Sequence, residues 1–146
     1  MHNATNGCNL SPQDADLTVN ELLGLGQLHL QDYNELLVLI QEQQARSIDF
    51  DAKGLVDFTN KIDKRVGEIA ANRLVLHKIC NRLIGFCGTK NPKISQIAKK
   101  LPKKYQSTLE VLIEAIDQKI EECVKELDAN RQLFKRNIGY LEGLVE

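Results

Sequence analysis

Three histidines and four cysteines are the residues of this sequence best suited to chemistry near neutral pH. His77 lies in "HKICNRLIG", and a histidine in the middle of a long helix is suited to accept a phosphoryl group. Phosphotransfer sites of this kind need a lysine and small residues beside the histidine. Here Cys80 and Asn81 stand where lysine and glycine are wanted. The sequence therefore favours a half-exposed structural role for His77.

A metal site is not indicated by the spacing of these residues. His77, Cys80 and Cys87 lie on one side of a predicted helix, but the ten residues from His77 to Cys87 span about 15 Å, too far for one ion. Neither His29 nor His77 follows a glutamate by three residues, as helical di-iron sites require. The cysteines show no CxxC pair, and three of them fall in helical patterns, which favours reduced, packed thiols. We predict no metal and no cofactor.

Other signatures of catalysis or nucleic-acid binding are weak. The sequence has no glycine-rich phosphate loop, GxSxG elbow or HExxH pair. Residues 88–109 carry lysines and no acid, a pattern that could bind phosphate or an acidic partner. No arginine or interleaved aromatic residue accompanies these lysines, so a solvated loop is favoured over nucleic-acid contact. We predict a protein that is not an enzyme and has no nucleic-acid partner.

The elements that would carry these side chains are predicted to be helices. Hydrophobic residues make up 42% and charged residues 27%, with four phenylalanines, three tyrosines and no tryptophan, which favours an all-α fold. The longest aliphatic run, "LLVLI" at 36–40, is far shorter than the roughly 18 residues of a membrane span. The polar start lacks a basic and then apolar signal segment. We expect a cytoplasmic protein without membrane insertion.

Seven-residue repeats of apolar residues predict three long helices. The first covers residues 15–47. The second covers 51–87, after Asp49 or Asp51 as the N-terminal cap, and the third covers 104–144. The second and third helices follow the repeats Leu55, Ile62, Ile69, Leu76, Leu83 and Ile113, Ile120, Leu127, Phe134, Leu141. Together they predict an elongated, coiled-coil-like bundle of antiparallel helices.

The predicted domain organisation is a flexible segment at residues 1–14 followed by one bundle at 15–146. A basic loop at 88–103 joins the last two helices, with a short helical turn between Pro92 and Pro102 whose apolar residues, Leu101 among them, face inward. Residues 1–57 carry nine acids and two bases, and residues 58–87 carry two acids and six bases. Opposite signs on neighbouring segments suit adjacent antiparallel helices.

Three stretches carry a resemblance to a known family: "YNELLVLIQEQQARSIDFDAKGLVDFTNKID", "KRVGEIAANRLVL" and "LDANRQLFKRNIGYLEGLV". Together they resemble the FlgN-type flagellar export chaperones over roughly residues 17–145. The residues that match the family pattern lie in all three predicted helices: Tyr33, Leu36, Leu37, Glu42, Asp51, Leu55, Lys61, Arg73, Asn130, Leu133, Phe134 and Ile138.

The resemblance implies a small cytoplasmic chaperone rather than an enzyme. Such a protein binds the C-terminal helices of hook-associated flagellar proteins, prevents their premature assembly and aids delivery to the type III export gate. The alternative is a structural coiled-coil protein that self-associates or acts as an adaptor. The residues expected to bind the partner lie on the third helix: Asn130, Leu133, Phe134, Asn137, Ile138, Leu141, Leu144 and Val145.

The apolar spacing and the glycines near the end of the third predicted helix agree with partner binding at this helix. A third helix of about 60 Å should project beyond the shorter pair. Gly139 and Gly143 weaken its last turns by about 1 kcal/mol each relative to alanine, while the apolar stripe continues through them. We expect this stripe to await a partner helix. The alternative is that it completes the chain's own core or a homodimer.

Overall fold

The computed structural model describes residues 12–82, 99 and 101–145, and the side chains of this set except those of residues 12, 14, 15, 140–142, 144 and 145. The described residues contain three long helices and no β-strand, which confirms the all-α prediction. The helices are α1 (Pro12–Ile48), α2 (Ala52–Arg82) and α5 (Lys103–Val145). As expected, the third predicted helix is the longest, with 43 residues.

The observed bounds differ from the predicted ones mainly at the start of α1. The described part of this helix starts at Pro12, within residues 1–14, which were predicted to be flexible. Proline is well tolerated in the first turn of a helix, where its missing N–H group has no partner to lose. The predicted end of the second helix at residue 87 and the N-terminal tail before residue 12 lie outside the described residues. So does most of the basic loop, although Leu101 is buried as predicted.

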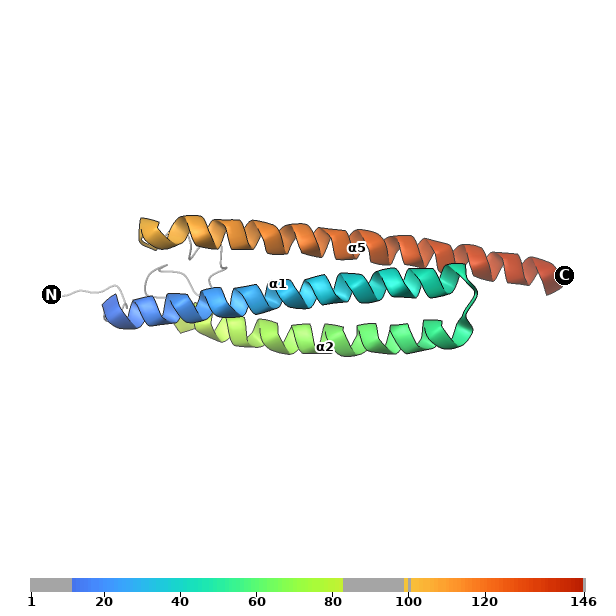
Figure 1. Ribbon diagram of the computed structural model, residues 1–146, viewed down its shortest axis with the longest axis horizontal. Coiled ribbons are helices and arrows are strands. Elements are labelled where there is room, and N and C mark those ends of the chain that lie inside the picture. The colour runs from blue at the N-terminus through green and yellow to red at the C-terminus, as the bar shows by residue number, and fades with distance from the viewer. Residues whose placement is uncertain (1–11, 83–98, 100, 146) are drawn as a thin grey trace.

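Helix α1 lies between the other two helices and packs along both of them (Figure 1). At one end of the rod the Tyr105 hydroxyl of α5 donates to Asp16 of α1, and at the other end Asn137 of α5 donates to Ser47 of α1. Helices α1 and α5 therefore run in the same direction. Helix α2 is antiparallel to both, so consecutive helices alternate in direction as the sequence predicted.

The core consists of two clusters that take side chains from all three helices. One cluster contains Val19, Leu22, Leu76, Ile79, Cys80, Leu101 and Leu109, and the other contains Leu36, Ile40, Ile62, Ile69 and Cys123. Ile62, Ile69 and Leu76, spaced by seven residues along α2, are 5 to 6% exposed. Their burial confirms the predicted register of the second helix.

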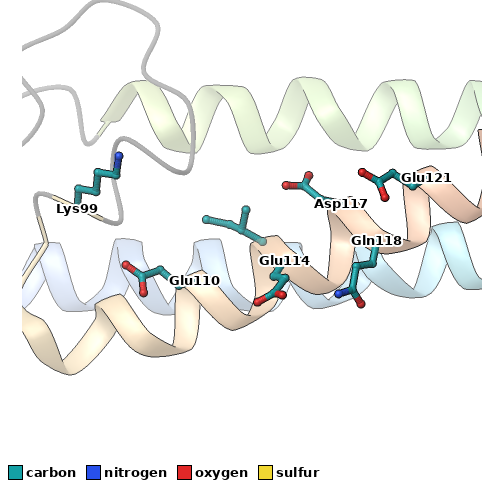
Figure 2. A pocket seen from close by; sticks show the side chains of 7 residues that line it. Lys99, Glu110, Glu114, Asp117, Gln118 and Glu121 are labelled. Carbon is teal, nitrogen blue, oxygen red and sulfur yellow. The ribbon is translucent and has the colours of Figure 1, made fainter.

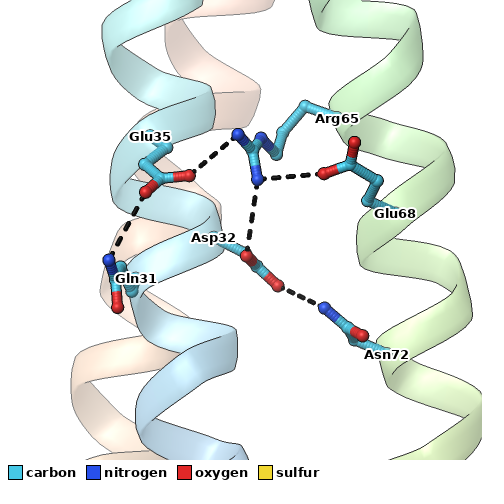
Figure 3. Close-up of polar contacts among 6 residues, drawn as sticks. All are labelled: Gln31, Asp32, Glu35, Arg65, Glu68 and Asn72. Atoms are coloured by element: carbon cyan, nitrogen blue, oxygen red, sulfur yellow. Dashed lines mark hydrogen bonds and ion pairs between the residues drawn. The ribbon is translucent and has the colours of Figure 1, made fainter.

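Charges of opposite sign link α1 to α2 as the segment charges predicted. The Arg65 guanidinium lies 3.0 Å from Glu35, 3.7 Å from Asp32 and 3.0 Å from Glu68, while Asn72 donates to Asp32 at 2.7 Å (Figure 3). These groups are partly exposed, so each pair contributes about 0 to 1 kcal/mol. They therefore help to select which helices pair, but they add little to the stability of the fold.

The turn between α1 and α2 has a defined hydrogen-bonded geometry. The Asp51 N–H donates to the Arg46 carbonyl at 2.9 Å and the Phe50 N–H to the Ser47 carbonyl at 3.2 Å, the two bonds of a Schellman motif. Phe50 therefore has φ of 55°, which costs a residue with a Cβ about 1 to 2 kcal/mol. Asp51 then accepts the Gly54 N–H at 3.0 Å and caps α2, as predicted.

Candidate partner-binding site

The C-terminal half of α5 is fastened to α1 by a buried asparagine. Asn130 is 1% exposed, and its Nδ2 donates to the Ile40 carbonyl at 2.9 Å and to Gln43 Oε1 at 3.0 Å. The Gln43 Nε2 donates in turn to the Thr59 hydroxyl of α2 at 3.0 Å. This polar network joins all three helices and fixes how α5 lies against α1.

A second asparagine one heptad later makes the last side-chain hydrogen bond between α5 and α1 in the described part of the chain. Asn137 Nδ2 donates to the Ser47 hydroxyl at 3.1 Å and lies 3.4 Å from the Ser47 carbonyl. Asn130 and Asn137 were both expected to bind a partner, but in the free chain both are engaged with α1. Their spacing of seven from the core position Cys123 is the sequence signal that places them on this face.

Three of the other predicted partner-binding residues have described side chains, and these are only partly covered by the rest of the chain. Leu133 and Phe134 are half-buried, and Ile138 is 55% exposed. The side chains of Leu141, Leu144 and Val145 lie outside the described set, but their backbone continues α5. This helix runs eight residues past Asn137, which is about 12 Å, and passes beyond the α1–α2 turn (Figure 1). The predicted projection of the third helix is therefore confirmed.

The two glycines at the end of α5 make no close approach to another described atom. A Cβ built at Gly139 or Gly143 would meet nothing within 4 Å. By contrast, a Cβ at Gly26 would lie 2.6 Å from Leu112, where α1 and α5 are closely packed. Packing among the described residues therefore does not explain the glycines at positions 139 and 143.

An open cleft of about 480 Å³ lies along the first half of α5 (Figure 2). Four exposed carboxylates and one lysine line it together with an amide and one half-buried isoleucine: Glu110, Glu114, Asp117, Glu121, Lys99, Gln118 and Ile113. No hydrogen bond or ion pair joins the four carboxylates to another described residue. Because these side chains are solvated, the cleft provides no desolvated acid–base pair for catalysis.

The histidines and cysteines within the described ranges are placed as structural residues. His77 is exposed, whereas His29 is 6% exposed and packs edge-on against Tyr33 with ring centroids 4.9 Å apart. Burial lowers the pKa of His29, and its Nδ1 lacks a hydrogen-bond partner among the described residues. Cys80 and Cys123 are buried, as expected for packed cysteines, and burial raises the pKa of Cys123. No cluster of three metal-ligating side chains occurs in the described part.

A rod of three helices with a projecting apolar stripe is typical of a helical protein that binds other proteins. The comparisons agree with this class. The family model described as FlgN protein matches residues 18–146, and the chain therefore belongs to the FlgN family, a family of chaperones in flagellar export. Comparisons with curated proteins and with solved structures found no match. Within the described ranges, no helix is long and apolar enough to cross a membrane.

Proposed function

We propose that this chain is a cytoplasmic chaperone of flagellar type III secretion that binds the C-terminal helices of hook-associated proteins. By covering these helices it prevents premature assembly, and it aids their delivery to the export gate. Membership of the FlgN family supports the general role. The observation that supports helix binding is the projection of α5 beyond the α1–α2 turn, with Ile138 55% exposed and Phe134 half-buried.

The proposed mechanism is the packing of a partner helix on the apolar stripe of α5. An amphipathic helix binds such a surface through apolar residues spaced three or four apart. Burial of the remaining exposed surface of Phe134 and Ile138 supplies the favourable free energy, because neither side chain is fully covered in the free chain. The proposed contact set is Leu133, Phe134, Ile138, Leu141, Leu144 and Val145, with Asn130 and Asn137 retained as anchors to α1.

Isothermal titration with C-terminal segments of hook-associated proteins tests this proposal. We expect wild-type chain to bind one of them, and Phe134→Ala combined with Ile138→Ala to weaken binding by about 2 kcal/mol or more. Val111→Ala, which truncates a residue 66% exposed nearer the start of α5, is the matched control and should bind as wild type does. Absence of binding by wild type at about 50 µM contradicts the proposal.

The second candidate function is self-association as a structural coiled coil or adaptor. Each of the three helices has large apolar side chains that are more than half exposed, such as Leu28, Leu74 and Val111, which favours additional packing surfaces. Sedimentation equilibrium together with hydrogen exchange separates the two functions. A stable oligomer with the end of α5 fully protected in the absence of any partner favours self-association.

A further inference from the structure

The hairpin tip, residues 48–56, holds an aromatic residue in a conformation that glycine adopts most readily. The Schellman hydrogen bonds from Asp51 to Arg46 and from Phe50 to Ser47 fix Phe50 at φ of 55°. Glycine is the usual residue at this position because a Cβ clashes with the following carbonyl group. The backbone of the tip is therefore strained by the presence of a side chain at residue 50.

Burial of the ring does not compensate for this strain in the free chain. Phe50 is 61% exposed, and Ile48 and Val56 beside it are 59% and 58% exposed. The backbone around them is held by Asp51, which accepts the Gly54 N–H and lies 3.7 Å from the Arg46 guanidinium. The tip thus presents three large apolar side chains on a well-supported turn. Strained residues of this kind concentrate at functional sites.

The hairpin tip lies beside the projecting end of α5. Ser47, three residues before Phe50, accepts the hydrogen bond from Asn137. From that contact α5 continues past the turn, so the tip and the α5 end form two sides of one corner (Figure 1). Ile138 is exposed on one side and Phe50 on the other. A helix bound to the α5 end would therefore reach the tip.

The charges around this corner define the chemistry of its occupant. Arg131, Lys135 and Arg136 of α5 are exposed and form no ion pair with another described residue. They favour acidic residues along the edges of a bound helix. Two exposed acids, Asp49 in the tip and Asp57 directly after it, outnumber the one exposed base of the tip, Lys53. This net negative charge favours the positively polarised N-terminus of that helix at the tip.

We propose that the hairpin tip is the second half of the partner-binding site. An amphipathic helix with acidic edges lies on the α5 end and covers Phe50 and its apolar neighbours. This inference rests on the proposed chaperone function and extends it from one helix to a corner made of two elements. The strained aromatic residue is retained because it contacts the partner.

The substitution Phe50→Gly separates this role from a role in folding. It relieves the strained conformation, which stabilises the fold. Glycine also increases the entropy of the unfolded chain, which opposes this gain but is the smaller effect, so Tm should stay unchanged or rise by about 2 to 4 °C. Affinity for the C-terminal segment that wild type binds should fall at least about tenfold, because the aromatic contact is lost. Phe50→Leu keeps an apolar side chain and should retain most of the affinity. Leu17→Ala, at the opposite end of the rod, should bind as wild type does.

The outcomes distinguish this inference from the function on which it rests. Wild-type binding with an unchanged Kd for Phe50→Gly overturns the role of the tip and leaves the chaperone function standing. A Tm of Phe50→Gly that lies several degrees below that of wild type also overturns the role of the tip, since Phe50 would then stabilise the fold. Absence of wild-type binding overturns both proposals.

Charge reversal tests the chemistry of the occupant. Arg131→Glu with Lys135→Glu should raise Kd at least about fivefold at low salt and less at high salt, because salt screens exposed charges. Tighter binding after the reversal overturns the assignment of an occupant with acidic edges.

Discussion

At the scale of single residues, Asn130 is a buried polar residue that links the helices by hydrogen bonds. Its amide donates hydrogen bonds to the Ile40 carbonyl of α1 and to Gln43 Oε1. The Gln43 amide donates in turn to the Thr59 hydroxyl of α2. Asn130→Ala removes both hydrogen bonds and leaves the Gln43 Oε1 atom without the donor it has here, so it should lower the free energy of unfolding by about 1 to 3 kcal/mol in urea titrations. Asn34→Ala, an exposed position on α1, is the control and should change it by no more than about 0.5 kcal/mol. An equal effect of both variants would contradict the role assigned to the network.

His29 makes the stability of the free chain depend on pH. Burial lowers its pKa from 6.5; the nearby Asp32 carboxylate opposes this and the Arg73 guanidinium adds to it. The unfolded chain therefore binds more protons than the folded chain as the pH falls through 6.5, so the free energy of unfolding should decrease between about pH 7.5 and about pH 5.5.

Urea unfolding of variants at both pH values assigns this dependence. His29→Leu removes the titrating group and should flatten the decrease, whereas the exposed His77→Gln should leave it as in wild type. A decrease of the same size in His29→Leu would show that other groups cause it.

At the scale of the helices, α2 is held mainly by its buried heptad positions. Ile69 is 5% exposed and packs in the same cluster as Leu36, Ile40 and Cys123 from the other two helices. Ile69→Ala should cost about 2 to 5 kcal/mol of unfolding free energy, since it removes buried surface and leaves a cavity. Leu74→Ala on the same helix, at a position 66% exposed, should cost less than about 0.5 kcal/mol. Equal melting temperatures for the two variants would disprove the register of α2.

The end of α5 should become more helical when its glycines are replaced. Because a Cβ at Gly139 or Gly143 meets nothing within 4 Å, alanine can be accommodated there without a clash. Each substitution should stabilise the helix by up to about 1 kcal/mol. The negative ellipticity at 222 nm should become stronger, and amide hydrogens at the α5 end should exchange more slowly. Loss of helicity would mean that the glycines are required by contacts made outside the described residues.

At the scale of the whole molecule, the three helices form a rod rather than a compact domain. Helix α5 alone, with 43 residues, is about 65 Å long. A rod of that length has a radius of gyration of about 19 Å, against about 15 Å for a compact domain of 146 residues. Small-angle X-ray scattering of the monomer should give the larger value. A value near 15 Å would mean that the helices fold back on one another in solution.

The packing of the rod also explains why charge patterning predicted ion pairs between α1 and α2 better than between α2 and α5. Acids of α1 and bases of α2 meet, as in the contacts of Arg65 with Asp32 and Glu35. The acids of α5 from Glu110 to Glu121 instead line a solvated cleft. Among the described residues, no ion pair joins a base of α2 to an acid of α5.

The sequence by itself determined the helices, their order and much of the core. Apolar spacing is a local property, so the repeats through Ile62, Ile69 and Leu76 indicated which face of α2 is buried, and Asp49 or Asp51 marked where that helix begins. Only the tertiary structure decided what each face meets. It showed that Asn130 and Asn137 donate hydrogen bonds to α1.

Phe50 is the residue that sequence reasoning missed. It lies outside every heptad repeat. No local sequence pattern distinguishes an exposed phenylalanine with a left-handed backbone conformation from an ordinary loop residue. Its conformation follows from how α1 ends against α2, and the position of the α1–α2 turn beside α5 follows from helix packing. These depend on contacts between distant residues, whose geometry is fixed only when all three helices share one core.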